Sequence, residues 1–214
     1  MKKVFLALMA AVALMAAVAP ASATLIPPMT SSPGLSLTSI PGLPAGTLVA
    51  SAGTINYSFG TPTNPTKNKG TVSENVYKDS SGFLFFVFQV TVASNANKGD
   101  IERLSTGDWD NSIHINAEQY IPGSDKQAFG VDRNGLGTVG INWNPLLLKG
   151  QTSAFIVLYT NATEVERGTI GLIDSGSSPD IPGYVAEPTP EPATLSLLGL
   201  GLLGLGSLRK KLRK

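Results

Sequence analysis

The chain has 214 residues, which is enough for one domain of ordinary size or at most two small ones. It contains no cysteine, which excludes disulfides, thiolate metal sites, a cysteine nucleophile and a lipidated cysteine. The formal net charge is +1, but between Thr24 and Glu191 nine Lys and Arg stand against fifteen Asp and Glu, a balance of −6 that argues against binding nucleic acid or anionic lipid by charge.

Residues 1–23 are typical of a secretory signal peptide. Lys2 and Lys3 form a basic start, residues 4–19 form an apolar run, and Ala21 and Ala23 supply the small side chains that signal peptidase requires. The alternative is an uncleaved anchor helix, but the run is shorter than the ~20 residues that span a bilayer. We therefore expect export, with cleavage after Ala23.

Residues 24–45 are uncharged and rich in Pro, Ser, Thr and Leu. We expect an extended leader here, which can add an edge strand.

Residues 46–186 consist of short apolar runs separated by turn-forming residues, and outside the two terminal apolar segments no window shows helical periodicity. The stretch 83–93 is the most apolar, so we expect a central strand that is buried on both faces at its start. Residues 60–70 are expected to form a polar loop. The expected strands are 48–52, 54–59, 71–77, 83–93, 113–120, 137–143, 154–160 and 169–173, with 184–185 as a last edge. This spacing predicts an all-β fold, a single β-sandwich with a jelly-roll-like layout.

The last segment, residues 187–214, has three parts. Pro190, Glu191 and Pro192 lie in a stiff proline-rich stretch, and residues 193–208 carry no charge and consist mostly of Leu and Gly. A basic cluster ends the chain, formed by Arg209, Lys210, Lys211, Arg213 and Lys214. An apolar segment followed by cations is a stop-transfer arrangement, which places the main domain outside the cell. Sixteen helical residues would measure about 24 Å, short of a ~30 Å hydrocarbon core, so the segment would be a marginal anchor.

This tripartite tail resembles the PEP-CTERM sorting signal. The resemblance implies recognition by exosortase, an integral-membrane cysteine protease-transpeptidase that cuts near the PEP motif and releases or re-anchors its substrate. It also implies a Gram-negative bacterial host that makes extracellular polysaccharide. A plain single-pass anchor with a proline-rich stalk is the alternative.

Two motifs have simple structural explanations. Gly199-Leu-Gly201-Leu-Leu-Gly204 matches a dinucleotide fingerprint, but no strand precedes it and no βαβ unit surrounds it, so we expect no cofactor. His114 is the single histidine, and it alternates with Ile113 and Ile115, so we expect it to face solvent.

Oxygen-rich loops and carboxylates leave further alternatives open. The stretches 95–100 and 108–111 suit either calcium or ordinary turns, because Asn, Asp and Gly serve both. A glycosidase needs two facing carboxylates, but no recognisable motif surrounds the candidates, so exposed solubilising charges are the default. These candidates are Glu74, Glu102, Glu118 and Glu164.

The aromatic side chains suggest a second function. Trp109, Tyr120, Trp143 and Tyr159 could form a sugar-stacking platform, although aromatic residues are more often core. The sequence therefore predicts a non-enzymatic cell-surface or matrix protein, with a carbohydrate-binding module for extracellular polysaccharide as the alternative and a hydrolase as a third hypothesis.

Overall fold

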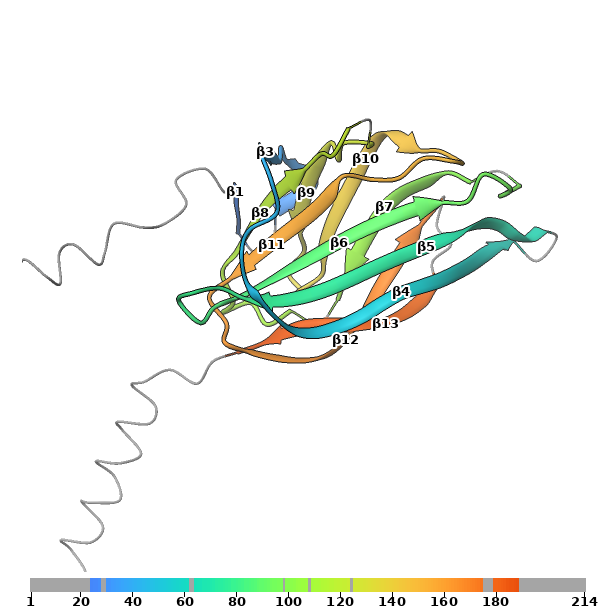
Figure 1. Ribbon diagram of the computed structural model, residues 1–214. Coiled ribbons are helices and arrows are strands. Elements are labelled where there is room, and N and C mark those ends of the chain that lie inside the picture. The colour runs from blue at the N-terminus through green and yellow to red at the C-terminus, as the bar shows by residue number, and fades with distance from the viewer. Residues whose placement is uncertain are drawn as a thin grey trace, which may run out of the picture.

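The computed structural model describes residues 24–27, 30–61, 64–97, 99–107, 109–123, 125–174 and 179–188, and these residues form two β-sheets packed face to face (Figure 1). The first sheet has the order β1 (Thr24–Ile26), β8 (Ile115–Tyr120), β11 (Phe155–Thr160), β6 (Leu84–Val92), β5 (Asn64–Lys78) and β4 (Thr47–Thr61). The short β3 (Thr38–Ile40) also pairs with β8, in parallel, while the other pairs are antiparallel. The second sheet has the order β13 (Asp180–Glu187), β12 (Glu164–Ile173), β7 (Ile101–Thr106), β10 (Val139–Leu147), β9 (Gly130–Arg133) and β2 (Thr30–Leu35).

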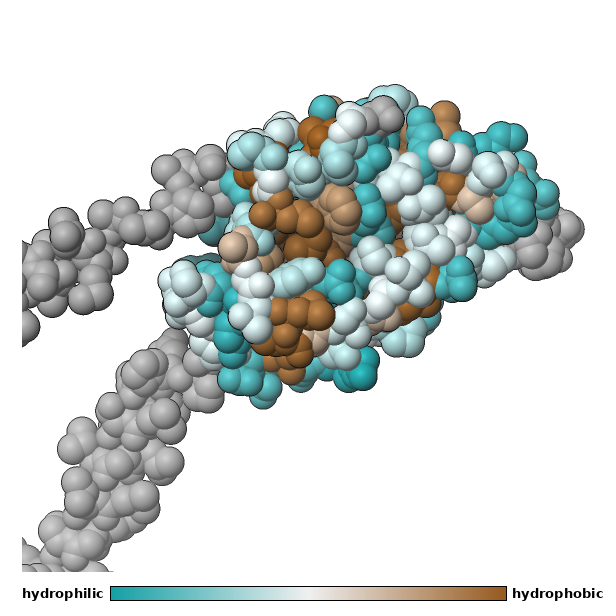
Figure 2. Space-filling view, in the orientation of Figure 1, coloured by the Kyte–Doolittle hydropathy of each residue, from teal (hydrophilic) through white to brown (hydrophobic). Residues whose placement is uncertain are grey.

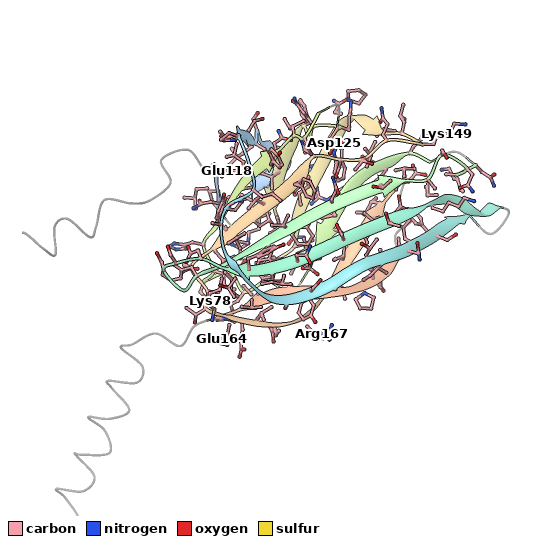
Figure 3. The ribbon with its side chains drawn as sticks, viewed as in Figure 1. Lys78, Glu118, Asp125, Lys149, Glu164 and Arg167 are labelled. Atoms are coloured by element: carbon pink, nitrogen blue, oxygen red, sulfur yellow. The ribbon has the colours of Figure 1, made fainter. Side chains whose placement is uncertain are left out.

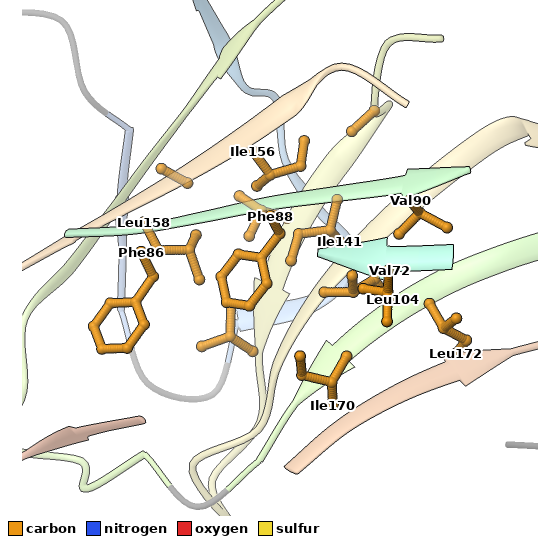
Figure 4. Close-up of a cluster of buried hydrophobic side chains, with 14 of the residues drawn as sticks. Val72, Phe86, Phe88, Val90, Leu104, Ile141, Ile156, Leu158, Ile170 and Leu172 are labelled. Atoms are coloured by element: carbon orange, nitrogen blue, oxygen red, sulfur yellow. The ribbon is translucent and has the colours of Figure 1, made fainter. Parts of the chain in front are cut away.

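The main core lies between the two sheets. Phe86, Phe88 and Val90 alternate along β6 and point inward, where they belong to one buried cluster with side chains of the second sheet such as Leu104 and Ile170 (Figure 4). Each fully buried side chain of this size stabilises the fold by roughly 1.5–3 kcal/mol. The predicted all-β architecture is therefore confirmed, and the jelly-roll layout stays a prediction.

A second apolar cluster lies on the outer face of the first sheet. Phe85, Val87 and Val157 are buried there, so β6 is buried on both faces at its start, as predicted. The connection from β3 to β4 passes over this cluster, because a Cβ added to Gly46 would lie 2.6 Å from the Phe85 ring. Figure 2 shows hydrophobic side chains gathered on this face of the sandwich.

The predicted polar loop at 60–70 is wrong. Residues 64–70 belong to β5, which pairs with β4 from Thr61↔Asn64 to Thr47↔Lys78. The polar side chains are held by partners far along the chain, since Lys67 Nζ lies 2.5 Å from Asp174 Oδ2 and Asn68 donates to the same oxygen at 2.8 Å. Local polarity is typical of a loop, but these long-range partners allow a strand.

Three other differences concern which residues form strands. The strands expected at 48–52 and 54–59 are one strand, β4, with register shifts beside Gly53. A glycine between two strand-like runs is typical of a turn, but here Gly53, with a φ of 69°, lies within the strand. Two strands, β7 and β9, were not expected, because Glu102, Arg103, Asp132 and Arg133 make them look like charged loops. The leader supplies three strands at sheet edges, β1, β2 and β3, where one was expected.

Gly137 gives a stability prediction. Its φ is +82°, and an added Cβ would lie 2.0 Å from the backbone oxygen of Trp109, so Gly137→Ala meets both strain and overlap. We expect a loss on the order of 2 kcal/mol in the free energy of unfolding, measured by urea denaturation. Gly42→Ala is the control, because nothing lies within 4 Å of its added Cβ. Equal stability of the two variants would contradict the close approach of Gly137 to the Trp109 backbone.

Candidate functional site

A cleft in the described part of the chain has a volume of about 850 Å³. It is bounded by the β8–β9 connection, the β10–β11 connection and the residues just before β3. Its lining residues are Ser36, Leu37, Gln119, Asp125, Lys126, Gln127, Ala128, Phe129, Asn144, Gly150, Gln151 and Thr152.

Backbone pairing fixes the two connections against each other. Lys126 N donates to Thr152 O at 2.8 Å, and Ala154 N donates to Lys126 O at 2.8 Å. At the base of the cleft the amide of Gln119 accepts a hydrogen bond from Ala128 N at 3.0 Å. Because strands and backbone bonds hold both walls, the cleft is a formed feature of the fold.

The cleft is polar and nearly balanced in charge. Gln127 and Asn144 are exposed amides that can both donate and accept hydrogen bonds, while Asp125 and Lys126 contribute one charge of each sign (Asp125 in Figure 3). Asp125 Oδ2 also accepts from Gln89 at 3.3 Å. Phe129 adds an aromatic ring that is 48% exposed. Such a mixture of amides and one ring suits a neutral ligand rich in hydroxyl groups.

None of these cleft residues was a sequence candidate. The sequence feature that could have indicated the cleft is a mostly polar run between two expected strands, Asp125–Phe129, which contains one aromatic residue. The sequence could not show that the β10–β11 connection lies against this run.

His114 is placed as predicted. Its side chain is exposed, whereas Ile113 and Ile115 are buried. The backbone N of His114 donates to Asn161 Oδ1 at 2.9 Å, which ties this loop to the β11–β12 turn.

The oxygen-rich stretch at 108–111 forms a turn in its described part. Asp110 Oδ1 accepts from Ser112 N at 2.7 Å, and hydrogen bonds from Ser112 hold the pKa of Asp110 below its usual value. The guanidinium of Arg133 donates to the backbone oxygens of Asp110 and Ile113. Asp108 lies outside the described residues, and among those that are described no three His, Cys, Asp or Glu side chains are grouped to hold a metal ion. The described geometry therefore gives no support to a calcium site in this stretch.

Two of the four candidate carboxylates are buried, which corrects the expectation of exposed charges. Glu74 lies between Val72 and Val76 in the main core and is fully buried. Its Oε2 accepts from Tyr184 N of β13 at 2.9 Å, and loss of solvation raises its pKa to about 8. Glu102 and Glu164 are exposed, as predicted.

The second buried carboxylate, Glu118, lies on the other face of the first sheet. It pairs with Val157 of the outer cluster, whereas Glu74 pairs with Phe88 of the main core. Burial, followed by the neighbouring Glu118, raises the pKa of Tyr159. The two buried carboxylates are therefore on opposite faces of one sheet and do not form a facing pair.

Both tryptophans belong to the core, the placement that the sequence favoured for aromatic residues, and this removes them from the alternative sugar-stacking platform. Trp109 and Trp143 are buried, and the indole N–H of Trp109 donates to Thr106 Oγ1. Tyr120 and Tyr159 are half-buried on the outer face of the first sheet. They lie there in aromatic pairs, Tyr120 stacked on Phe155 at 6.1 Å and Tyr159 against Phe85 at 5.9 Å between ring centroids.

The sorting residues expected from the sequence lie outside the described residues. These are Ala21 and Ala23 at the start of the chain, Pro190, Glu191 and Pro192 in the proline-rich stretch, the apolar segment 193–208, and Arg209, Lys210, Lys211, Arg213 and Lys214. In the described part of the chain no helix is long and apolar enough to cross a membrane. The last described strand, β13, ends at Glu187, directly before this tail.

The described part of the chain is thus a β-sheet domain that precedes a C-terminal segment of distinct composition. Comparison with protein-family models matches residues 188–211 to the PEP-CTERM protein-sorting motif. The chain is therefore a PEP-CTERM sorting-domain protein, as the sequence predicted, and the motif indicates export, membrane anchoring before processing, and exosortase as the processing partner. No curated protein and no solved structure matches the chain.

Proposed function

We propose that this chain is a non-enzymatic protein of the cell surface or extracellular matrix, delivered through its signal peptide and sorted by exosortase. The observation that carries the proposal is the position of the sorting motif, which begins at residue 188, one residue after the last strand of the folded domain. The tail holds the domain at the inner membrane until processing, and the domain then acts outside the cell. Residues 24–187 are the delivered part.

The placement of the carboxylates supports a role without catalysis. Glu74 and Glu118 are on opposite faces of the first sheet, and Glu102 and Glu164 are exposed. A glycosidase needs two carboxyl groups that face one substrate at a separation of about 5–10 Å. Glu74 and Glu118 therefore do not form the pair that a hydrolase needs.

Surface labelling tests the delivery route. In an exosortase-bearing host we expect the mature chain to begin at Thr24, because Ala21 and Ala23 satisfy signal peptidase. We also expect intact cells to expose the domain to a membrane-impermeant amine reagent, which can reach lysines such as Lys149. In an exosortase deletion strain the chain should stay in the membrane fraction. A mature protein that still begins at Met1 would overturn the export route.

The cleft favours a second candidate function, a carbohydrate-binding module. Exposed amides match the donor and acceptor pattern of sugar hydroxyls, and Phe129 offers a ring for stacking against a pyranose face. The opposite charges of Asp125 and Lys126 favour a neutral polysaccharide over a charged one. This candidate assigns extracellular polysaccharide as the partner.

Substitution of the exposed ring tests this second function. We expect Phe129→Ala to weaken binding to a neutral polysaccharide about tenfold, since losing one stacked ring costs roughly 1.4 kcal/mol. Leu136→Ala is the control, because Leu136 is also exposed but lies in the β9–β10 turn, away from the cleft. The measurement is a glycan array followed by titration calorimetry. Absence of binding by the unsubstituted domain would remove this candidate.

A further inference from the structure

The domain is tied very closely to its membrane segment. Five residues, 188–192, separate the end of β13 at Glu187 from the apolar segment that begins at Ala193. Even fully extended, this linker spans only about 20 Å. Three of its five residues are prolines, which limits folding back. One end of the sandwich is therefore held close to the lipid headgroups while the tail is uncut.

Hydrogen bonds identify which end this is. Glu187 pairs with Glu164, so the end of β13 lies at the start of β12. The β11–β12 turn is joined to the start of β6, because Leu84 N donates to Ala162 O at 2.9 Å. The start of β4 lies there too, since Thr47 pairs with Lys78 at the end of β5. We call this the tail end. Figure 3 shows Lys78 and Glu164 at this end of the sandwich and Lys149 at the other.

The tail end exposes apolar side chains. Leu48 is 53% exposed at the start of β4. Val49, which follows it, and Phe83, directly before β6, are also exposed. Phe83 closes the β5–β6 turn, where Asp79 N donates to Phe83 O at 2.9 Å. Exposed apolar side chains that a short tether holds near a bilayer are typical of a membrane-contacting surface.

A second turn extends the same surface. Leu136, in the β9–β10 turn, is 87% exposed. Asn111 Nδ2 donates to Gly135 O at 3.0 Å, and this loop is bonded to the β11–β12 turn through His114 and Asn161. Leu136 therefore also lies at the tail end.

The charges at the tail end show which force would act. Glu164 and Glu187 lie at the point where the tail leaves the domain, and Lys78 lies nearby. Two carboxylates beside one ammonium do not attract anionic headgroups. Insertion of Leu48, Val49 and Phe83 into the interface is then the favourable contribution, and it does not depend on salt.

We propose that the tail end of the sandwich docks on the membrane surface before processing, with Leu48, Val49 and Phe83 inserted at the lipid interface. The proposal rests on the membrane anchoring of the sorting tail. The tether raises the local concentration of this weakly apolar surface at the bilayer, so docking needs little affinity of its own. Once the tail is cut, that concentration is lost and the domain leaves the membrane. Docking would also hold the peptide bonds near Pro190 at a constant height above the bilayer.

Cysteine labelling tests the docking, because the chain has no natural cysteine. The mature chain from Thr24 to Lys214 is prepared with Leu48→Cys, Phe83→Cys or Leu148→Cys. Each variant is labelled with a fluorophore and reconstituted into phosphatidylcholine vesicles that carry a headgroup quencher. Leu148 is the matched control, since it is 45% exposed but lies in the β10–β11 connection at the opposite end. We expect labels at 48 and 83 to lose most of their fluorescence and the label at 148 to keep it.

A further variant separates docking from mere proximity. A label at Ser81→Cys, an exposed turn residue at the tail end, should be quenched, and the pair Leu48→Asp and Val49→Asp should abolish that quenching. Equal fluorescence at 48, 83 and 148, or quenching at 81 that the aspartates leave unchanged, would overturn the docking. Vesicle flotation is read in parallel. A chain that fails to float would overturn the membrane anchor, whereas a floating chain without quenching overturns only the docking.

Discussion

Replacing Pro190, Glu191 and Pro192 with alanine is expected to abolish exosortase processing while membrane insertion continues. The full-length chain should then accumulate in the membrane fraction of an exosortase-bearing host. The effect is close to all-or-none, because the change removes the motif that the processing enzyme reads. Cell fractionation with immunoblotting gives the measurement.

The physical reason lies in the separate tasks of the three tail segments. Each proline fixes its own φ and biases the residue before it away from helix, so we expect Pro190 and Pro192 to keep the stretch extended for a protease active site. The apolar segment 193–208 and the basic cluster that follows hold and orient the chain in the bilayer. Alanine is a strong helix former, so three alanines would favour a helical linker, which a protease accepts poorly.

A matched control uses a proline of the same stretch that lies outside the three substituted residues. Pro188→Ala leaves Pro190, Glu191 and Pro192 unchanged and should be processed like the natural sequence. If the triple alanine variant is also processed normally, or if the natural chain stays full-length in such a host, the tail acts only as an anchor with a stalk.

Glu74→Gln is expected to stabilise the domain strongly at alkaline pH and to have little effect in acid. Glu74 is fully buried, its Oε2 accepts from Tyr184 N at 2.9 Å, and its pKa is raised to about 8. Glutamine has nearly the same shape, keeps an oxygen for Tyr184, and never ionises. It therefore removes the cost of a buried negative charge.

The sign follows from proton linkage. Because the folded pKa of about 8 lies above the unfolded value of 4.5, the folded state holds this proton more tightly. Stability from the protonated Glu74 is fully present below the unfolded pKa, decreases as pH rises between the two values, and is lost above the folded one. The loss amounts to roughly 5 kcal/mol, at about 1.4 kcal/mol per pKa unit over this shift.

Urea denaturation of residues 24–188 at about pH 5 and about pH 9 measures this effect, since these values lie near the two ends of the transition. The natural domain should weaken between the two conditions far more than Glu74→Gln does. Glu166→Gln serves as the control, because Glu166 is an exposed carboxylate on β12. Parallel pH profiles for Glu74→Gln and the natural domain would show that Glu74 does not titrate with a raised pKa.

The sorting tail and the central strand could be predicted from the sequence because their signals are local. Membrane insertion depends on the summed hydropathy of a short segment and on the charges beside it, and both are read directly from residues 193–214. Likewise, Phe83–Ala93 is apolar at successive positions, which is typical of a strand buried on both faces, and this strand is β6. The all-β class followed from turn residues at regular spacing for the same reason.

The burial of single side chains was decided by tertiary structure alone. Glu74 alternates with two valines, so its parity pointed inward, but only the approach of β13 supplies the backbone N–H that a buried carboxyl needs. Trp109 and Trp143 are buried in the core by partners distant in the chain. Residues 64–70 form a strand because they pair with β4. The cleft arises where two connections meet through Lys126 and Thr152. Such contacts join residues that are far apart in the sequence, and no local pattern shows that they meet. The delivery signals are local and could be predicted from the sequence, whereas the surface of the delivered domain is determined by the packing of the two sheets.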